Sequence, residues 1–100
     1  MGYYVKANFG WREYWISQGD NGDIVKVDPK IVPVQYFLGI LGITGITAYV
    51  ELFKIGELRE GKDIVFVSSA AGGVGSVACQ LANIKGCQVI GSCGSDEKVR

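Results

Sequence analysis

The chain has 100 residues with 10 basic and 10 acidic side chains, so its formal net charge at pH 7 is zero. This balance, with the basic residues scattered singly, argues against a nucleic-acid partner and against binding to an anionic membrane. The 3 cysteines (Cys79, Cys87 and Cys93) match no metal or disulfide spacing, and the chain has no histidine. We therefore expect no metal, and reduced thiols in a cytoplasmic protein.

Residues 1–28 are expected to be rich in β-structure. Residues 9–16 have the aromatic content of a strand, and their tryptophan and tyrosine side chains are expected either to pack under a sheet or to form an aromatic wall for a substrate. Residues 17–23 are dense in turn-forming residues, and the alternation of residues 24–27 predicts a second, half-buried strand.

Residues 31–50 carry no formal charge and form a stretch long enough to span a bilayer. Pro33, Gln35 and repeated glycines argue against a transmembrane helix, and we favour a buried loop followed by a helix in a soluble fold. Apolar residues spaced by three and four predict that this helix covers residues 47–55 and ends at Gly56.

The second half of the chain has the pattern of one strand–helix–strand unit. Residues 64–67 are uniformly apolar, which is typical of a central strand in a parallel sheet that is covered on both faces. A helix follows, on which Val77, Leu81 and Ile84 share one face, and residues 87–92 predict the next strand. The pattern predicts an α/β fold containing the first part of a Rossmann-type parallel sheet.

The turn between the first of these strands and the helix is rich in glycine, with the spacing Ala70-x-Gly72-x-x-Gly75. This is the phosphate-binding pattern of dinucleotide folds. Gly72 lets the backbone approach a pyrophosphate, Gly75 allows close packing of the helix, and Gly73 adds freedom to the turn. The first N–H groups of the helix would supply hydrogen-bond donors and partial positive charge. A tight turn without a ligand is the structural alternative.

The segment after the second strand indicates which cofactor is preferred. A site for NADH usually has an acidic residue about 20 residues after the glycines, where it binds the ribose 2′-hydroxyl. Residues 91–95 have no carboxylate, and the first acidic residue is Asp96. Lys98, with Ser92 and Ser95 as hydroxyl donors, suits a 2′-phosphate and predicts NADPH; the alternative is that Lys98 is an ordinary solvated lysine.

Four segments carry a resemblance to a known family, namely residues 41–49, 69–76, 85–91 and 94–99. In this order and spacing they resemble the zinc-independent medium-chain dehydrogenase/reductases. The resemblance is strongest to their prostaglandin reductase group, which includes leukotriene B4 12-hydroxydehydrogenase and the alkenal double-bond reductases. It implies NADPH-dependent reduction of the carbon–carbon double bond of α,β-unsaturated ketones and aldehydes, of the 15-oxo-prostaglandin or alkenal type.

The resemblance also implies roles for individual residues. Lys98 would meet the 2′-phosphate with Ser95 nearby, and the Ile43-Thr44 turn and Thr47 would lie beside the nicotinamide. The residues expected to line the pyrophosphate are Gly72, Gly73, Val74 and Gly75.

The chain departs from the family in two ways. Family members usually have Met-Pro where this chain has Ile43-Thr44, so the pocket beside the nicotinamide is expected to differ in shape. Family members are also much longer, and the resemblance implies that residues 1–30 are the last strands of a GroES-like β domain. Residues 31–100 would then be the N-terminal part of an NADP-binding Rossmann domain.

Catalytic residues are left unassigned, because the family's proton-donating tyrosine lies beyond Arg100. Tyr49 is a phenol in the right region, but ordinary packing is the alternative for it. The resemblance implies a homodimer for the complete protein and a small-molecule substrate. Two further alternatives are an NADPH quinone reductase and a non-catalytic nucleotide-binding fragment. The 100 residues alone are expected to show no turnover.

Overall fold

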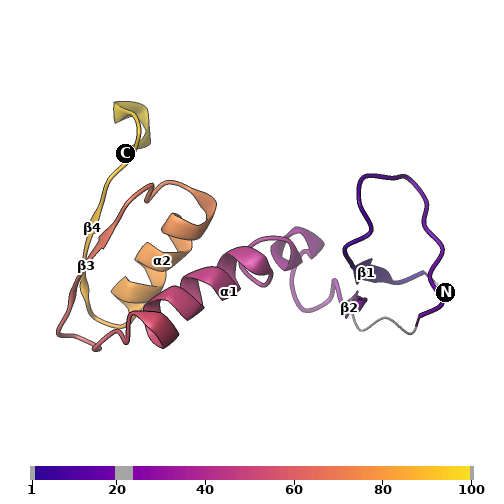
Figure 1. Cartoon of the computed structure of the whole chain (residues 1–100), viewed down its shortest axis with the longest axis horizontal. Helices are drawn as coiled ribbons and strands as arrows, with labels where there is room; N and C mark the ends of the chain where they lie inside the picture. The colour runs from indigo at the N-terminus through magenta and orange to yellow at the C-terminus, as the bar shows by residue number, and fades with distance from the viewer. Residues whose placement is uncertain (1, 20–23, 100) are drawn as a thin grey trace.

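The computed structural model describes residues 2–19 and 24–99. These residues form a small β-ribbon and a larger α/β unit, joined by the segment that leads into helix α1 (Figure 1). The molecule measures 48 × 31 × 24 Å, with a radius of gyration of 17.0 Å. A compact domain of this length would have a radius of gyration of about 13 Å, so the chain is elongated.

The β-ribbon pairs two short antiparallel strands, β1 (Tyr4–Lys6) and β2 (Val25–Val27). Strand β2 confirms the strand predicted at residues 24–27, whereas β1 was not predicted. The 3-10 helix η1 (Val34–Phe37) follows the ribbon and forms an apolar cavity with it.

The strand predicted at residues 9–16 is not present in the structure. Trp11 and Tyr14 are exposed to solvent, and Trp15 stacks on Phe9 with ring centroids 4.8 Å apart. The prediction that these aromatic residues pack under a sheet is therefore wrong, because no strand in the described part of the chain lies beside them. Of the predicted turn at 17–23, residues 20–23 lie outside the described residues.

Helix α1 (Ile43–Tyr49) continues directly into η2 (Val50–Ile55), whose hydrogen bonds have the wider π spacing. The helix ends at Gly56 as predicted, but it begins before residue 47. Gly45 is buried in α1, and a Cβ there would overlap the backbone of Ile40, so this glycine serves close packing rather than a loop. No helix in the described part of the chain is long and apolar enough to cross a membrane.

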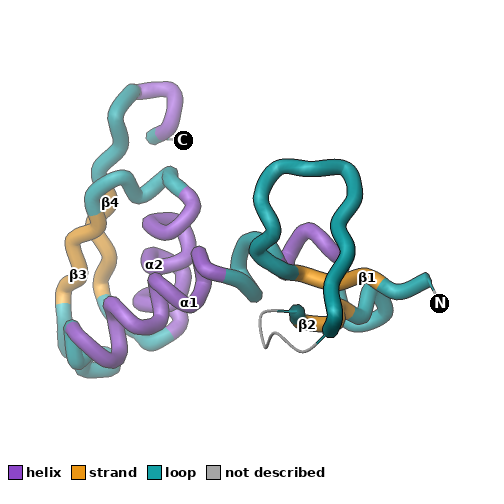
Figure 2. The backbone as a smooth tube through the Cα atoms, turned by 45° about the vertical axis from the view of Figure 1, so that its right-hand side comes forward, coloured by secondary structure: helices purple, strands orange, loops and turns teal. Residues whose placement is uncertain are grey.

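The α/β unit consists of β3 (Ile64–Val67), α2 (Gly73–Ile84) and β4 (Gln88–Gly91), followed by the short η3 (Asp96–Lys98). Strands β3 and β4 are parallel neighbours, as predicted. Helix α2 packs on one face of this sheet, and α1 packs against α2 (Figure 2). The core is formed by Ala48, Val77 and Ala78, with Leu52, Val67, Val74 and Leu81 around them.

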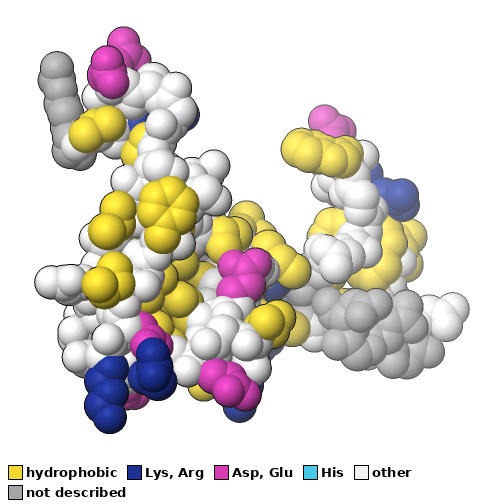
Figure 3. Space-filling view, turned by 60° about the vertical axis from the view of Figure 1, so that its left-hand side comes forward, with side chains coloured by type: hydrophobic (Ala, Val, Ile, Leu, Met, Phe, Trp, Pro, Cys, Tyr) yellow, Lys and Arg dark blue, Asp and Glu magenta, His cyan; other side chains and the backbone are white. Residues whose placement is uncertain are grey.

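Only one face of the sheet is covered, which corrects the prediction of a strand buried on both faces. Val65 and Val67 are half-buried under α2, whereas Ile64 and Phe66 are 66% and 65% exposed. Ile84 was predicted to face the core but is 75% exposed at the last position of α2. Hydrophobic side chains are accordingly visible over the surface of this unit (Figure 3).

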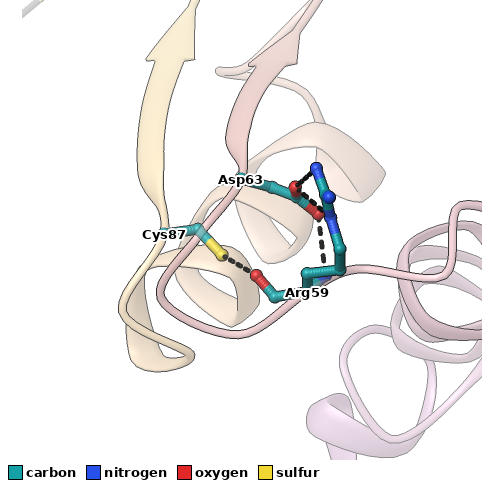
Figure 4. A network of polar contacts seen from close by, with 3 residues as sticks. All are labelled: Arg59, Asp63 and Cys87. Carbon is teal, nitrogen blue, oxygen red and sulfur yellow. Dashed lines mark hydrogen bonds and ion pairs between the residues drawn. The ribbon is translucent and has the colours of Figure 1, made fainter.

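The segments that enter β3 and β4 are tied together at their amino ends. Arg59 forms an ion pair with Asp63 at 2.6 Å, and the Arg59 backbone N–H donates to the same carboxylate at 2.7 Å. The hydrogen bond from the Arg59 side chain lowers the pKa of Asp63 below its ordinary value. The buried Cys87 thiol lies 3.5 Å from the Arg59 carbonyl oxygen (Figure 4). The Gly61 N–H donates to the Lys85 carbonyl at 2.9 Å.

Candidate functional site

The glycine-rich turn leaves the carboxyl end of β3 and leads into α2. Ligands of open α/β sheets bind at this end of the strands. The Ser92 N–H donates to the Val67 carbonyl at 2.9 Å, and the Ala70 N–H donates to the Ser92 carbonyl at 2.9 Å. These hydrogen bonds hold the turn beside the segment that follows β4.

The turn is stabilised around the carbonyl group of Ser69. Ser69 has a left-handed backbone with φ of 52°, and its carbonyl oxygen accepts a hydrogen bond from the Gly72 N–H at 2.8 Å. A Cβ at Gly75 would overlap this oxygen and would lie 3.0 Å from the Ser69 carbonyl carbon. Gly75 is therefore required for close packing, as predicted, although its nearest neighbour is the turn itself rather than the strand.

The start of α2 presents unpaired donors. Gly72 is the N-terminal cap and makes no side-chain capping bond. The N–H groups of Gly73, Val74 and Gly75 lie in the first turn, where a helix has no acceptor for them, and no described residue accepts from them. Together with the helix dipole, these groups favour a bound anion.

Ala70, which stands at the first glycine position of the motif, fits because Gly91 lies opposite. A Cβ at Gly91 would lie 2.6 Å from the Cβ of Ala70. The end of β4 therefore provides the space that the alanine methyl group occupies. This contact explains how the turn accommodates the departure from the glycine pattern.

Two cavities lie on either side of the turn, and Ser69 and Gly72 line both of them. The first has a volume of about 470 Å³ and extends between the turn, β3 and η2, where Glu51 and Leu52 reach its wall. The second has a volume of about 290 Å³ and is lined by Ser69, Ala71, Gly72, Cys93, Gly94 and Lys98. The turn therefore forms a common wall with space on both sides.

The predicted site residues are brought together in part. Lys98 lines the second cavity with Gly72, although 26 positions separate them in the sequence. Ser95 is the N-cap of η3, where its carbonyl accepts the Lys98 N–H at 3.1 Å; its side chain is exposed and does not line the cavity. Thr47 is half-buried on α1 and lines neither cavity, and its role stays a prediction.

The structure also places Thr44 and Tyr49, which sequence reasoning had considered for the site, and Ser69 and Cys93, which it had not. The methyl group of Thr44 lies 3.6 Å from the position of a Cβ on Gly73, so the start of α1 meets the start of α2. Tyr49 packs against Phe53 with ring centroids 4.9 Å apart, which is ordinary packing. Sequence reasoning missed Ser69 and Cys93; the only signal for Ser69 was its position between a strand and the glycine motif.

Comparison with known proteins gives relatives over nearly the whole chain. The (+)-pulegone reductase of Mentha piperita is 46% identical over 90 residues, which are 90% of this chain and 26% of the relative. Prostaglandin reductase 1 of Sus scrofa is 44% identical over 99 residues, which are 98% of this chain and 30% of the relative. No protein-family model matches the chain.

A solved structure agrees with these sequence relatives. The crystal structure of CurA from Vibrio vulnificus in complex with NADPH has a TM-score of 0.81 and 41% identity, and it covers 96% of this chain and 28% of CurA. The chain is homologous to NADP-dependent oxidoreductases. The resemblance to the prostaglandin reductase group and the α/β fold class are thereby confirmed. The chain spans less than a third of the length of these proteins.

Proposed function

We propose that the protein is an NADPH-dependent oxidoreductase that reduces the carbon–carbon double bond of α,β-unsaturated ketones and aldehydes. The observation that carries this proposal is the glycine-rich turn with uncapped N–H groups at the start of α2, placed beside Lys98. Homology to prostaglandin reductase 1 supports the choice of reaction and of a small-molecule substrate of the 15-oxo-prostaglandin or alkenal type.

The donor set fits the charges of NADPH. A pyrophosphate needs hydrogen-bond donors at close range, and the N–H groups of Gly73, Val74 and Gly75 would supply them together with the helix dipole. The 2′-phosphate needs a cation, which Lys98 would provide in the second cavity. None of the described residues lining that cavity is a carboxylate, so the 2′-hydroxyl of NADH would lack its usual acidic partner.

In this proposal the residues of the glycine turn and Lys98 bind and orient the cofactor. When bound, the cofactor would supply a hydride to the β-carbon of the substrate. The resulting enolate would need a stabilised oxyanion and a proton at the α-carbon. The packed Tyr49 is not assigned to this proton transfer, and the catalytic residues stay unassigned.

Finer assignments belong to the same proposal. The separate β-ribbon supports residues 1–30 as the last strands of a GroES-like domain, and the parallel strands support residues 31–100 as the start of a Rossmann domain. We further propose a homodimer, which follows from the family resemblance. We also propose a cytoplasmic location, which the free thiols support.

The test is turnover by the protein as its gene encodes it. NADPH consumption should be followed by nicotinamide absorbance with an alkenal, a 15-oxo-prostaglandin and a quinone as alternative substrates. We expect faster turnover of the enones than of the quinone, and weaker activity with NADH. Preferred reduction of the quinone would favour the sister activity, and no binding of NADPH would refute the proposal.

A further inference from the structure

We propose that Ser69 is a positioning residue, whose left-handed backbone holds the glycine turn in the shape that receives the cofactor. This inference rests on the proposed function and names a residue that acts through the turn. It concerns the backbone of Ser69 rather than its hydroxyl group, which makes no hydrogen bond with any described residue.

The conformation of Ser69 is unusual for its place in the fold. Among the described residues, Ser69 and Glu57 are the two non-glycine residues with positive φ, at 52° and 47°. Glu57 follows Gly56 at the end of η2, where helices commonly turn left-handed. Ser69 instead joins a strand to a helix. A left-handed L-residue is disfavoured and persists where its surroundings require it.

The left-handed turn directs the Ser69 carbonyl toward the start of α2. This oxygen accepts the Gly72 N–H at 2.8 Å and lies against Gly75, which has no Cβ to displace it. Gly72 is thereby fixed as the helix cap, and the next N–H groups are left for a phosphate. A negative φ at Ser69 would swing this carbonyl away and break its hydrogen bond with Gly72.

Ser69 also forms the wall between the two cavities. It lines both the larger cavity under η2 and the smaller one beside Lys98. A change of its backbone would therefore alter both sides of the turn at once. The expected result is weaker cofactor binding, because binding would have to restore a backbone that no longer prefers this shape.

The experiment compares Ser69→Gly, Ser69→Ala and Ser69→Val in the protein as its gene encodes it. Glycine adopts a left-handed backbone freely, alanine less so, and a β-branched valine least. We expect the Kd for NADPH to rise in that order, with Ser69→Gly retaining tight binding and Ser69→Val about tenfold weaker. The KM for NADPH should rise in parallel while kcat at saturating NADPH is kept, because the residue positions the cofactor only.

Glu57→Val is the matched control, since it places the same side chain at the other left-handed residue, which lines neither cavity. This variant should lower the Tm and leave the Kd for NADPH unchanged. The preference for NADPH over NADH should survive in Ser69→Val, because Lys98 is intact.

Several outcomes would overturn the inference. If Ser69→Gly and Ser69→Val weaken NADPH binding equally, the role belongs to the hydroxyl group. If Ser69→Val lowers the Tm but leaves the Kd for NADPH unchanged, the residue is merely structural. If Ser69→Val does not fold, equal Kd values for the glycine and alanine variants would overturn it. Failure of the unmutated protein to bind NADPH would instead refute the proposed function.

Discussion

Gly75→Ala tests the packing between the glycine turn and α2. The added Cβ would overlap the Ser69 carbonyl oxygen and would lie 3.0 Å from the Ser69 carbonyl carbon and 3.1 Å from the Ala70 Cα. These are backbone atoms, so no side-chain rotation relieves the overlap. The start of α2 must move away from the turn, and the hydrogen bond from the Gly72 N–H to the Ser69 carbonyl must lengthen.

The magnitude follows from two opposing effects. Overpacking of this kind costs about 1–3 kcal/mol, and contact with rigid backbone places it near the upper end. Replacing a helical glycine by alanine stabilises the helix by about 1 kcal/mol through its higher helix propensity. We therefore expect Gly75→Ala to lower the free energy of unfolding by about 2 kcal/mol and to weaken NADPH binding.

Gly73→Ala is the matched control, because it lies in the same helical turn without the overlap. Its nearest neighbour would be the Thr44 methyl group at 3.6 Å, an ordinary contact. This variant should be unchanged or more stable by up to about 1 kcal/mol. Urea unfolding of the gene-encoded protein, with NADPH titration of each folded variant, measures both effects. A Gly75→Ala variant as stable as Gly73→Ala would refute the argument.

Three further predictions concern single contacts. Lys98→Ala should lower the ratio of NADPH to NADH affinity about tenfold, and an unchanged ratio in binding titrations would contradict its role. Gly91→Ala should destabilise the fold by about 1–3 kcal/mol in urea unfolding, and adding Ala70→Gly should restore part of that stability. If the effects of the two substitutions on stability simply add, the two positions are not in direct contact. Asp63→Asn should remove the stability that comes from the lowered carboxyl pKa. The difference in free energy of unfolding between the variant and the unmutated protein should be largest above the ordinary carboxyl pKa of 3.8, and it should vanish as pH falls through the lowered folded-state pKa. A difference in stability that does not depend on pH would exclude the Arg59 pairing as its cause.

The parts of the fold that could be predicted from sequence are those with a local pattern. The apolar run at 64–67, the helix after the glycines and the second strand were predicted because periodicity and turn residues agree there. The start of α1 was missed because Gly45 is read as a loop residue, whereas its role is close packing against Ile40. That contact joins residues five positions apart, but the spacing of apolar residues carries no signal for it.

Prediction failed where burial depends on neighbours. The aromatic residues at 9–16 have strand propensity, yet β-propensity is realised only beside a partner strand. Phe66 is apolar enough for a doubly covered strand but is exposed on the face that α2 does not cover. At the site, the glycine turn was located from its spacing and Lys98 from its place after the second strand, and their roles in cofactor binding stay predictions. The left-handed conformation of Ser69 could not be predicted, because a serine in the sequence gives no indication of that conformation.

The contact between Ala70 and Gly91 also has an evolutionary consequence. Because one methyl group fills the space between the turn and the end of β4, the combined volume at these two positions is restricted. Among descendants of this sequence, a larger residue at position 91 should become acceptable only after position 70 has changed to glycine. The order of substitution along a lineage would then be constrained by a single pair of carbon atoms.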